Sequence, residues 1–372
     1  MILPGMSQGL TLSYSQMGLI GTVNFAGYLV AVLFCGALAD RLGYRLLIAL
    51  ALATIGATMI IIGHSSSLPL ILCLYALCGM GSGAANVPMM ALISHWFGRS
   101  HRGRATGFVV IGSGFAILLS GKLIPWLNEL AGVDGGWRLS WQVLGAIILL
   151  ISLLCLVMLR NTPSDQGLRP YGEKPENGAL PKLGRESTAN VKTIAHLGAI
   201  YFLFGYTYVI YATFIVTTLI REHGFTEAAA GNFWAIVGLL SLLSGPVFGT
   251  LSDKIGRQKT LAMVFLIQTV AYLLVAIKLP SLFLLVSIAC FGLVAWSIPS
   301  IMAALVGDYA GPHKAARIFG LVTFIFALGQ IAGPAVAGVI AEESGSFAGS
   351  FLMAGACTLL GVALALRLAP AK

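Results

Sequence analysis

The sequence predicts an all-α polytopic membrane protein built from two pseudo-symmetric helix bundles. Its composition is the first observation, because 58% of the 372 residues are hydrophobic and only 9% are charged. A soluble domain carries about a quarter charged residues. The second observation is a series of long charge-free runs, and the third is a motif that occurs once in each half of the chain. Together they predict helices whose solvent is lipid and whose arrangement repeats.

The spanning helices follow from the length of the charge-free runs. A bilayer core about 30 Å thick needs about 20 apolar residues per helix. Residues 1–39 and 46–98 carry no Asp, Glu, Lys or Arg, and the second run is long enough for two helices. We therefore expect eleven spans, at 14–39, 45–63, 68–96, 103–128, 138–160, 193–219, 230–251, 259–278, 281–305, 315–341 and 346–368.

The loop charges predict the orientation. Eighteen Lys and Arg residues fall on one side of these spans and only four on the other, namely Lys122, Arg138, Arg221 and Lys278. Because positive loops stay in the cytoplasm, the first side is predicted to be cytoplasmic, with the C-terminus on it. We expect an integral protein of a bacterial inner membrane.

A proline-rich segment divides the spans into two sets. Residues 161–192 contain Pro163, Pro170, Pro175 and Pro181 together with charges of both signs, which is typical of a solvated linker. We expect an N-terminal bundle of five spans over 1–160, a cytoplasmic linker over 161–192, and a C-terminal bundle of six spans over 193–372.

An internal repeat relates the two halves. The segment GALADRLGYR at 36–45 returns as GTLSDKIGRQ at 249–258, and the same register carries Arg104 onto Arg317. In this register the helix at 193–219 has almost no partner in the first half, so we expect a twelve-span architecture that lacks its first helix here, with Met1 to Gly5 as a remnant. A truncated or internally started sequence explains this, and a true eleven-span variant is the alternative.

The repeated motif resembles the signature of the major facilitator superfamily, which implies alternating access around a site near the midplane. Asp40 is expected to face the positive N-terminus of a helix that starts near Ala315, and Asp253 one that starts near Arg104. Topology anchoring is the alternative role for the arginines. The expected cytoplasmic gate consists of Gly36, Asp40, Arg41, Gly43, Arg45, Arg104, Gly249, Asp253, Lys254, Gly256, Arg257 and Arg317.

Polar and aromatic residues inside the spans are the candidates for substrate contact, because polar groups are costly in lipid. Lys122 either reaches the outer surface or faces the cavity and attracts an anion. The aromatic residues could equally pack the bundle. The predicted lining consists of Asn24, Tyr28, Asn86, Met90, Lys122, Tyr208, Tyr211, Trp296, Ser300 and Gln330.

The pattern of charges and cysteines narrows the function. All thirteen acidic residues lie in loops or at helix ends, and neither a metal-ligand cluster nor a nucleophile–base pair is evident, so we expect no enzyme, catalytic residue, metal or cofactor. The basic residues do not form one face, which argues against nucleic acid. The sequence predicts a monomeric secondary transporter, a symporter with H⁺ or Na⁺ as candidate co-transported ion, that carries a small organic anion by rocker-switch alternating access. The alternatives are a neutral sugar or drug carrier, or a truncated membrane protein that does not transport.

Overall fold

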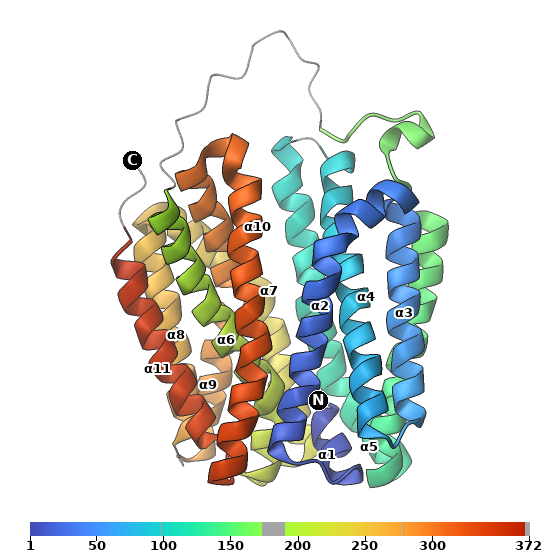
Figure 1. Ribbon diagram of the computed structural model, residues 1–372. Helices are drawn as coiled ribbons and strands as arrows, with labels where there is room; N and C mark the ends of the chain where they lie inside the picture. The colour runs from blue at the N-terminus through green and yellow to red at the C-terminus, as the bar shows by residue number, and fades with distance from the viewer. Residues whose placement is uncertain (98, 173–189, 278, 369–372) are drawn as a thin grey trace.

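The computed structural model describes residues 1–97, 99–172, 190–277 and 279–368, while the side chains at 94, 99–104, 106–108, 110, 133–134 and 310–317 lie outside the description. The described chain is almost entirely helical (Figure 1). Its elements are α1 (Leu3–Gly9), α2 (Tyr14–Leu42), α3 (Tyr44–His64), α4 (Leu68–Trp96), α5 (Arg99–Met158), the 3₁₀ turn η1 (Pro163–Gln166), α6 (Val191–Arg221), α7 (Glu227–Ile255), α8 (Arg257–Ala276), α9 (Ser281–Val294), α10 (Ser297–Ser344) and α11 (Ala348–Leu366).

The predicted membrane-crossing all-α fold is confirmed, with two differences in where helices begin and end. Two predicted spans merge in α5, which bends where Gly132 adopts φ 73° and ψ 178°. The span predicted at 281–305 breaks after Val294. Helix α10 holds both the rest of that span and the span predicted at 315–341, and it turns back between them at the top of Figure 1. Within the described residues, ten helices are long and apolar enough to cross a membrane.

The signature motif forms the same turn in both halves. Gly43 joins α2 to α3 with φ 76°, and Gly256 joins α7 to α8 with φ 97°. Positive φ is strained for residues that carry a Cβ, so glycine is required at this turn. The two glycines occupy equivalent positions of the repeat, in the register that aligns residue 36 with residue 249.

The register of the repeat also holds for contacts between helices. A Cβ added at Gly18 of α2 would overlap the carbonyl oxygen of Pro334 on α10, and one added at Gly231 of α7 would overlap that of Gly121 on α5. In the repeat, Gly231 is the counterpart of Gly18, and Pro334 is the counterpart of Gly121. The same register relates the contact of Gly79 with Asn24 to that of Gly292 with Val237. It also relates the contact of Gly56 with Gly145 to the hydrogen bond between Thr269 and Thr358.

The described contacts between the two bundles gather at one end. We call the end where residues 161–192 connect the halves the linker end, at the top of Figure 1, and the other the far end. The bundles meet along α2 with α10 and α5 with α7, and every hydrogen bond between them in the described chain lies in the far half. These bonds are Tyr14–Gly345, Ser15–Glu342, Thr22–Ile331, Lys122–Asn232, Asn128–Glu227 and Ser7–Arg221.

Four glycines toward the linker end face open space. A Cβ added at Gly36, Gly112, Gly249 or Gly320 would meet no described atom within 4 Å, whereas Gly18 and Gly121 in the far half are in tight contact. Among the described residues, the bundles are therefore packed together in the far half and lie apart toward the linker end (Figure 1).

Candidate functional site

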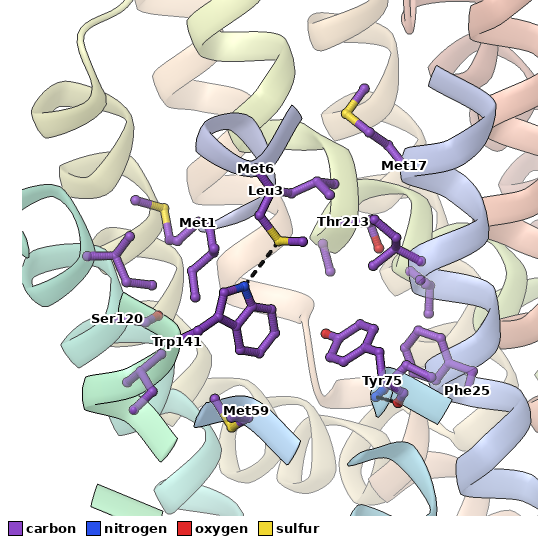
Figure 2. Close-up of a pocket in the computed structure, with 18 of the residues that line it drawn as sticks. Met1, Leu3, Met6, Met17, Phe25, Met59, Tyr75, Ser120, Trp141 and Thr213 are labelled. Atoms are coloured by element: carbon purple, nitrogen blue, oxygen red, sulfur yellow. Dashed lines mark hydrogen bonds between the residues drawn. The ribbon is translucent and has the colours of Figure 1, made fainter. Parts of the chain in front are cut away.

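A cavity of about 460 Å³ lies between the two bundles. Its walls come from α1 to α5 on one side and from α6 and α7 on the other (Figure 2). The volume falls in the range of roughly 300–1,000 Å³ that is usual for small-molecule sites. It is lined by Met1, Ile2, Leu3, Met6, Met17, Ile20, Gly21, Asn24, Phe25, Met59, Tyr75, Ser120, Ile124, Trp141, Leu144, Tyr208, Val209, Ala212, Thr213 and Trp234.

On the N-terminal side, the polar groups of the cavity are mostly held by neighbours. The Asn24 side-chain amide donates to the Tyr75 carbonyl oxygen at 3.1 Å, which ties α2 to α4. The Trp141 indole N–H donates to the Met6 sulfur at 3.1 Å, the contact drawn dashed in Figure 2. The rings of Tyr75 and Trp141 meet edge to face with centroids 5.5 Å apart. A thioether is a weak acceptor, so the indole N–H remains available to a stronger one.

On the C-terminal side, Tyr208 is the centre of an aromatic and amide cluster. The Gln330 side-chain amide donates to the Tyr208 hydroxyl oxygen at 2.6 Å, and the Tyr208 ring stacks on Phe204 with centroids 4.9 Å apart. Trp296 packs edge-on against Tyr208 at 6.1 Å, at the break between α9 and α10. The Trp296 indole N–H and the Thr323 hydroxyl are shielded from solvent and have no hydrogen-bond partner in the described chain. Of these two unsatisfied groups, the Trp296 indole belongs to a ring that contacts the cavity-lining Tyr208.

The structure brings part of the predicted lining together. Asn24 and Tyr208 line the cavity, and Gln330 and Trp296 contact Tyr208 from behind. Tyr28 lies one helical turn beyond Asn24 on α2, toward the linker end.

The other predicted lining residues lie outside the cavity. Tyr211 is fully buried inside the C-terminal bundle, where it shares a 2.8 Å hydrogen bond with Ser287. It is turned about 60° round α6 from Tyr208, away from the side on which Val209 and Thr213 line the cavity. Lys122 is exposed and donates to the Asn232 side-chain oxygen on α7 at 2.5 Å. Asn86, Met90 and Ser300 are exposed or half-buried and also do not line it.

Several lining residues were missed by the sequence analysis. They are Met6, Met17, Met59, Tyr75, Trp141, Thr213 and Trp234, together with the small apolar residues. In the sequence, a methionine or aromatic residue in a span is indistinguishable from one that packs between helices.

The signature residues form different contacts in the two halves. In the C-terminal half, Arg257 bridges Asp253 at 2.5 Å and Asp308 at 3.2 Å. In the N-terminal half, the Arg45 side chain donates to the Leu156 carbonyl oxygen at 2.6 Å and the Arg45 backbone N–H donates to the Asn161 side-chain oxygen.

Several of the predicted gate contacts lie outside the described residues. The helix start expected near Ala315, opposite Asp40, falls where the side chains of 310–317 are not described, so this contact stays a prediction. Asp40, Arg41 and Lys254 are exposed. The side chains of Arg104 and Arg317 lie outside the described residues.

The chemistry of the cavity is that of a binding site. Among its described lining residues none is Asp, Glu, Lys, Arg or His, and the described chain has no group of three or more His, Cys, Asp or Glu residues that could hold a metal ion. The arrangement offers an apolar wall, a few neutral hydrogen-bond donors, and access between two packed bundles.

Comparison with known proteins identifies the family. The family model described as "Uncharacterised MFS-type transporter YbfB" matches residues 1–366. A hexuronate transporter of Bacillus subtilis (strain 168) is 23% identical over 369 residues, which cover 95% of this chain and 85% of the relative. A probable sulfoacetate transporter of Cupriavidus necator is 24% identical over 385 residues, covering 96% and 86%.

The fold has solved counterparts. The crystal structure of a mutant of the nucleoside transporter NupG superposes with a TM-score of 0.76 at 14% identity, covering 99% of this chain and 94% of the other. At that identity the likeness shows the fold alone, which is the two-bundle transporter fold. With the family model matching nearly the whole sequence, the chain belongs to the major facilitator superfamily, whose members are membrane transporters and not enzymes.

Proposed function

We propose that this protein is a secondary active transporter that moves a small organic anion across a bacterial inner membrane, with its C-terminus in the cytoplasm. Its residues 1–160 and 193–372 would act as two rigid bundles joined by the linker 161–192. The observation that carries the proposal is a cavity between two bundles related by an internal repeat, whose hydrogen bonds to each other, among the described residues, all lie in the far half. Two similar bundles around one site can rock between two open shapes.

An anionic substrate is supported by the named relatives and by one cation near the bundle boundary. The relatives are named for hexuronate and sulfoacetate, both acids. Lys122 follows Gly121, which packs against Gly231, and binds Asn232 across the same boundary. Opening the far end would separate α5 from α7, break this bond, and free the ammonium group to attract an incoming anion.

The signature residues fit a gate that closes when the linker end closes. Gly36 and Gly249 face open space in this structure, and Asp40 and Asp253 are exposed there. In an outward-open shape these segments would approach the opposite bundle. We propose H⁺ or Na⁺ as the coupled ion and a monomer as the transporting unit.

Uptake by proteoliposomes tests the proposal. The purified chain would be assayed with labelled glucuronate, sulfoacetate, tartrate, a nucleoside and a neutral sugar, under imposed pH and sodium gradients. We expect saturable uptake of at least one acid. The uptake rate should fall about tenfold in Lys122→Ala, as for a charge pair that loses one partner, and should remain near that of the unmodified protein in Lys122→Arg. Uptake of only neutral solutes would refute anion transport.

A neutral solute is the alternative, and one observation favours it. No acidic or basic side chain is among the described residues that line the cavity. A neutral molecule would therefore enter without the free-energy cost of burying an unpaired charge. Unchanged uptake of an acid in Lys122→Ala would leave the anion proposal standing but remove the role given to this lysine.

A further inference from the structure

The cavity wall is rich in apolar and flexible side chains, which suit a polyhydroxylated acid poorly. Four of its twenty lining residues are methionines, namely Met1, Met6, Met17 and Met59. Aromatic rings of Phe25, Tyr75, Trp141, Tyr208 and Trp234 complete much of the remaining wall. Methionine side chains are flexible and polarizable and make favourable contacts with aromatic rings. This wall is suited to enclose an apolar or aromatic group.

Most of the hydrogen-bonding side chains that line the cavity already have a partner in the protein. Asn24 and Ser120 donate to backbone carbonyl oxygens, Tyr208 accepts from Gln330, and Trp141 donates to the Met6 sulfur. No hydrogen bond from the side chain of Tyr75, Thr213 or Trp234 to another described residue is found. Figure 2 shows the Tyr75 hydroxyl directed toward the Trp141 ring across the space. Two donors therefore lie close together, next to a thioether that can be displaced by a stronger acceptor.

The number of donors sets a limit on the number of polar groups that the ligand can bury. Each substrate hydroxyl buried without a partner costs binding free energy, and sites discriminate strongly on this basis. A sugar acid has several hydroxyl groups besides its carboxylate, and the described cavity has few partners for them. One oxyanion, by contrast, would be satisfied by the Tyr75 hydroxyl and the Trp141 indole N–H.

We propose that the solute carried is an organic monoanion with an apolar or aromatic body, whose oxyanion is held by Tyr75 and Trp141 and whose body lies against Met17, Met59 and Phe25. This rests on the proposed function in taking the bound acid to be the transported solute. It differs from the hexuronate and sulfoacetate for which the relatives are named, because those acids lack a sizeable apolar body.

Binding to the purified protein tests this independently of transport. The melting midpoint in detergent would be measured with 3-phenylpropionate and with glucuronate at equal concentration, since a ligand that binds the folded state raises the midpoint. We expect 3-phenylpropionate to raise it and glucuronate to raise it much less. An equal or larger rise with glucuronate, or none with 3-phenylpropionate, would overturn the proposal.

Matched variants locate the effect. In Met59→Gln the wall gains an amide at nearly constant length, so we expect the affinity for 3-phenylpropionate to fall about tenfold, while Met59→Leu keeps it. Tyr75→Phe should weaken the same acid about tenfold. Affinity unchanged in Met59→Gln and Tyr75→Phe would refute the assignment. If these binding results hold and no acid is taken up by proteoliposomes, the proposed transport function fails while the ligand class stands.

Discussion

The Glu342 carboxylate on α10 accepts a hydrogen bond from the Ser15 backbone N–H on α2 at 3.1 Å, across the boundary between the two bundles. Ser15 lies in the first turn of α2, where backbone N–H groups have no partner within the helix. A negative charge at this position is stabilised by the helix dipole. One bundle thus places a carboxylate on the helix start of the other at the far end.

We predict that Glu342 favours the shape in which the far end is closed. Glu342→Gln keeps the size of the side chain and removes its charge, so the far end should open more often, by roughly fivefold for about 1 kcal/mol lost. The measurement is the labelling rate of a cysteine at Ser120 by a membrane-impermeant thiol reagent applied from the far side, in a chain freed of its six native cysteines. Glu343→Gln, one residue away on the same helix, is the control, and equal rates in both variants would contradict the prediction.

The glycine contact between α5 and α7 should be needed for far-end closure. A Cβ at Gly121 would overlap the Gly231 carbonyl oxygen, whereas one at Gly112 on the same helix would meet no atom within 4 Å. Overpacking costs about 1–3 kcal/mol, so Gly121→Ala should shift the population toward the far-end-open shape by roughly fivefold or more. The spin-label distance between the far ends of α5 and α7 would report this. In Gly112→Ala the distance distribution should remain that of the unmodified chain, and a similar shift in both variants would show that the contact is not the cause.

The sequence sufficed to predict the repeat but not which helical face meets the cavity. The repeat spacing relates Gly43 to Gly256. Both positions are glycine because few other residues can occupy a turn with positive φ. The spacing also brings Asn24 and Tyr208 to the cavity. Tyr211 is only three residues from Tyr208, yet it is buried in the bundle. The sequence does not predict this, because both sides of a transporter helix are apolar and no hydrophobic periodicity distinguishes them.

A buried amide in the C-terminal bundle should lower stability. Gln268 on α8 is fully buried, and neither of its amide atoms has a hydrogen-bond partner in the described chain. An unsatisfied buried polar group costs about 1–3 kcal/mol, so Gln268→Leu should raise the melting midpoint in detergent. Its counterpart in the first half of the repeat is Ile55, also buried, and Ile55→Gln should lower the midpoint. A lower midpoint in Gln268→Leu would mean that the amide is satisfied by a bound water molecule.

The linker ends of the two bundles are held by different pairs at equivalent positions. Tyr44 and His95 are the repeat counterparts of Arg257 and Asp308, and the His95 ring nitrogen is 3.2 Å from the Tyr44 hydroxyl, just as the Arg257 side chain is 3.2 Å from Asp308. The N-terminal bundle therefore has an aromatic pair where the C-terminal bundle has an ion pair. If the backbones are equivalent there, the double variant Tyr44→Arg with His95→Asp should form the same ion pair.

A double-mutant cycle on melting midpoints measures this exchange. Each single variant leaves a new charge without its partner, so both should be less stable than their combination. The coupling free energy should be about 0.5–1 kcal/mol, as for partly exposed ion pairs, and it should shrink at about 1 M salt, where the Debye length is about 3 Å. The ion pair Arg257–Asp308, tested in the same way, provides the reference value. Additive single effects would show that the repeat relation holds for the helices but not for the side chains at the linker end.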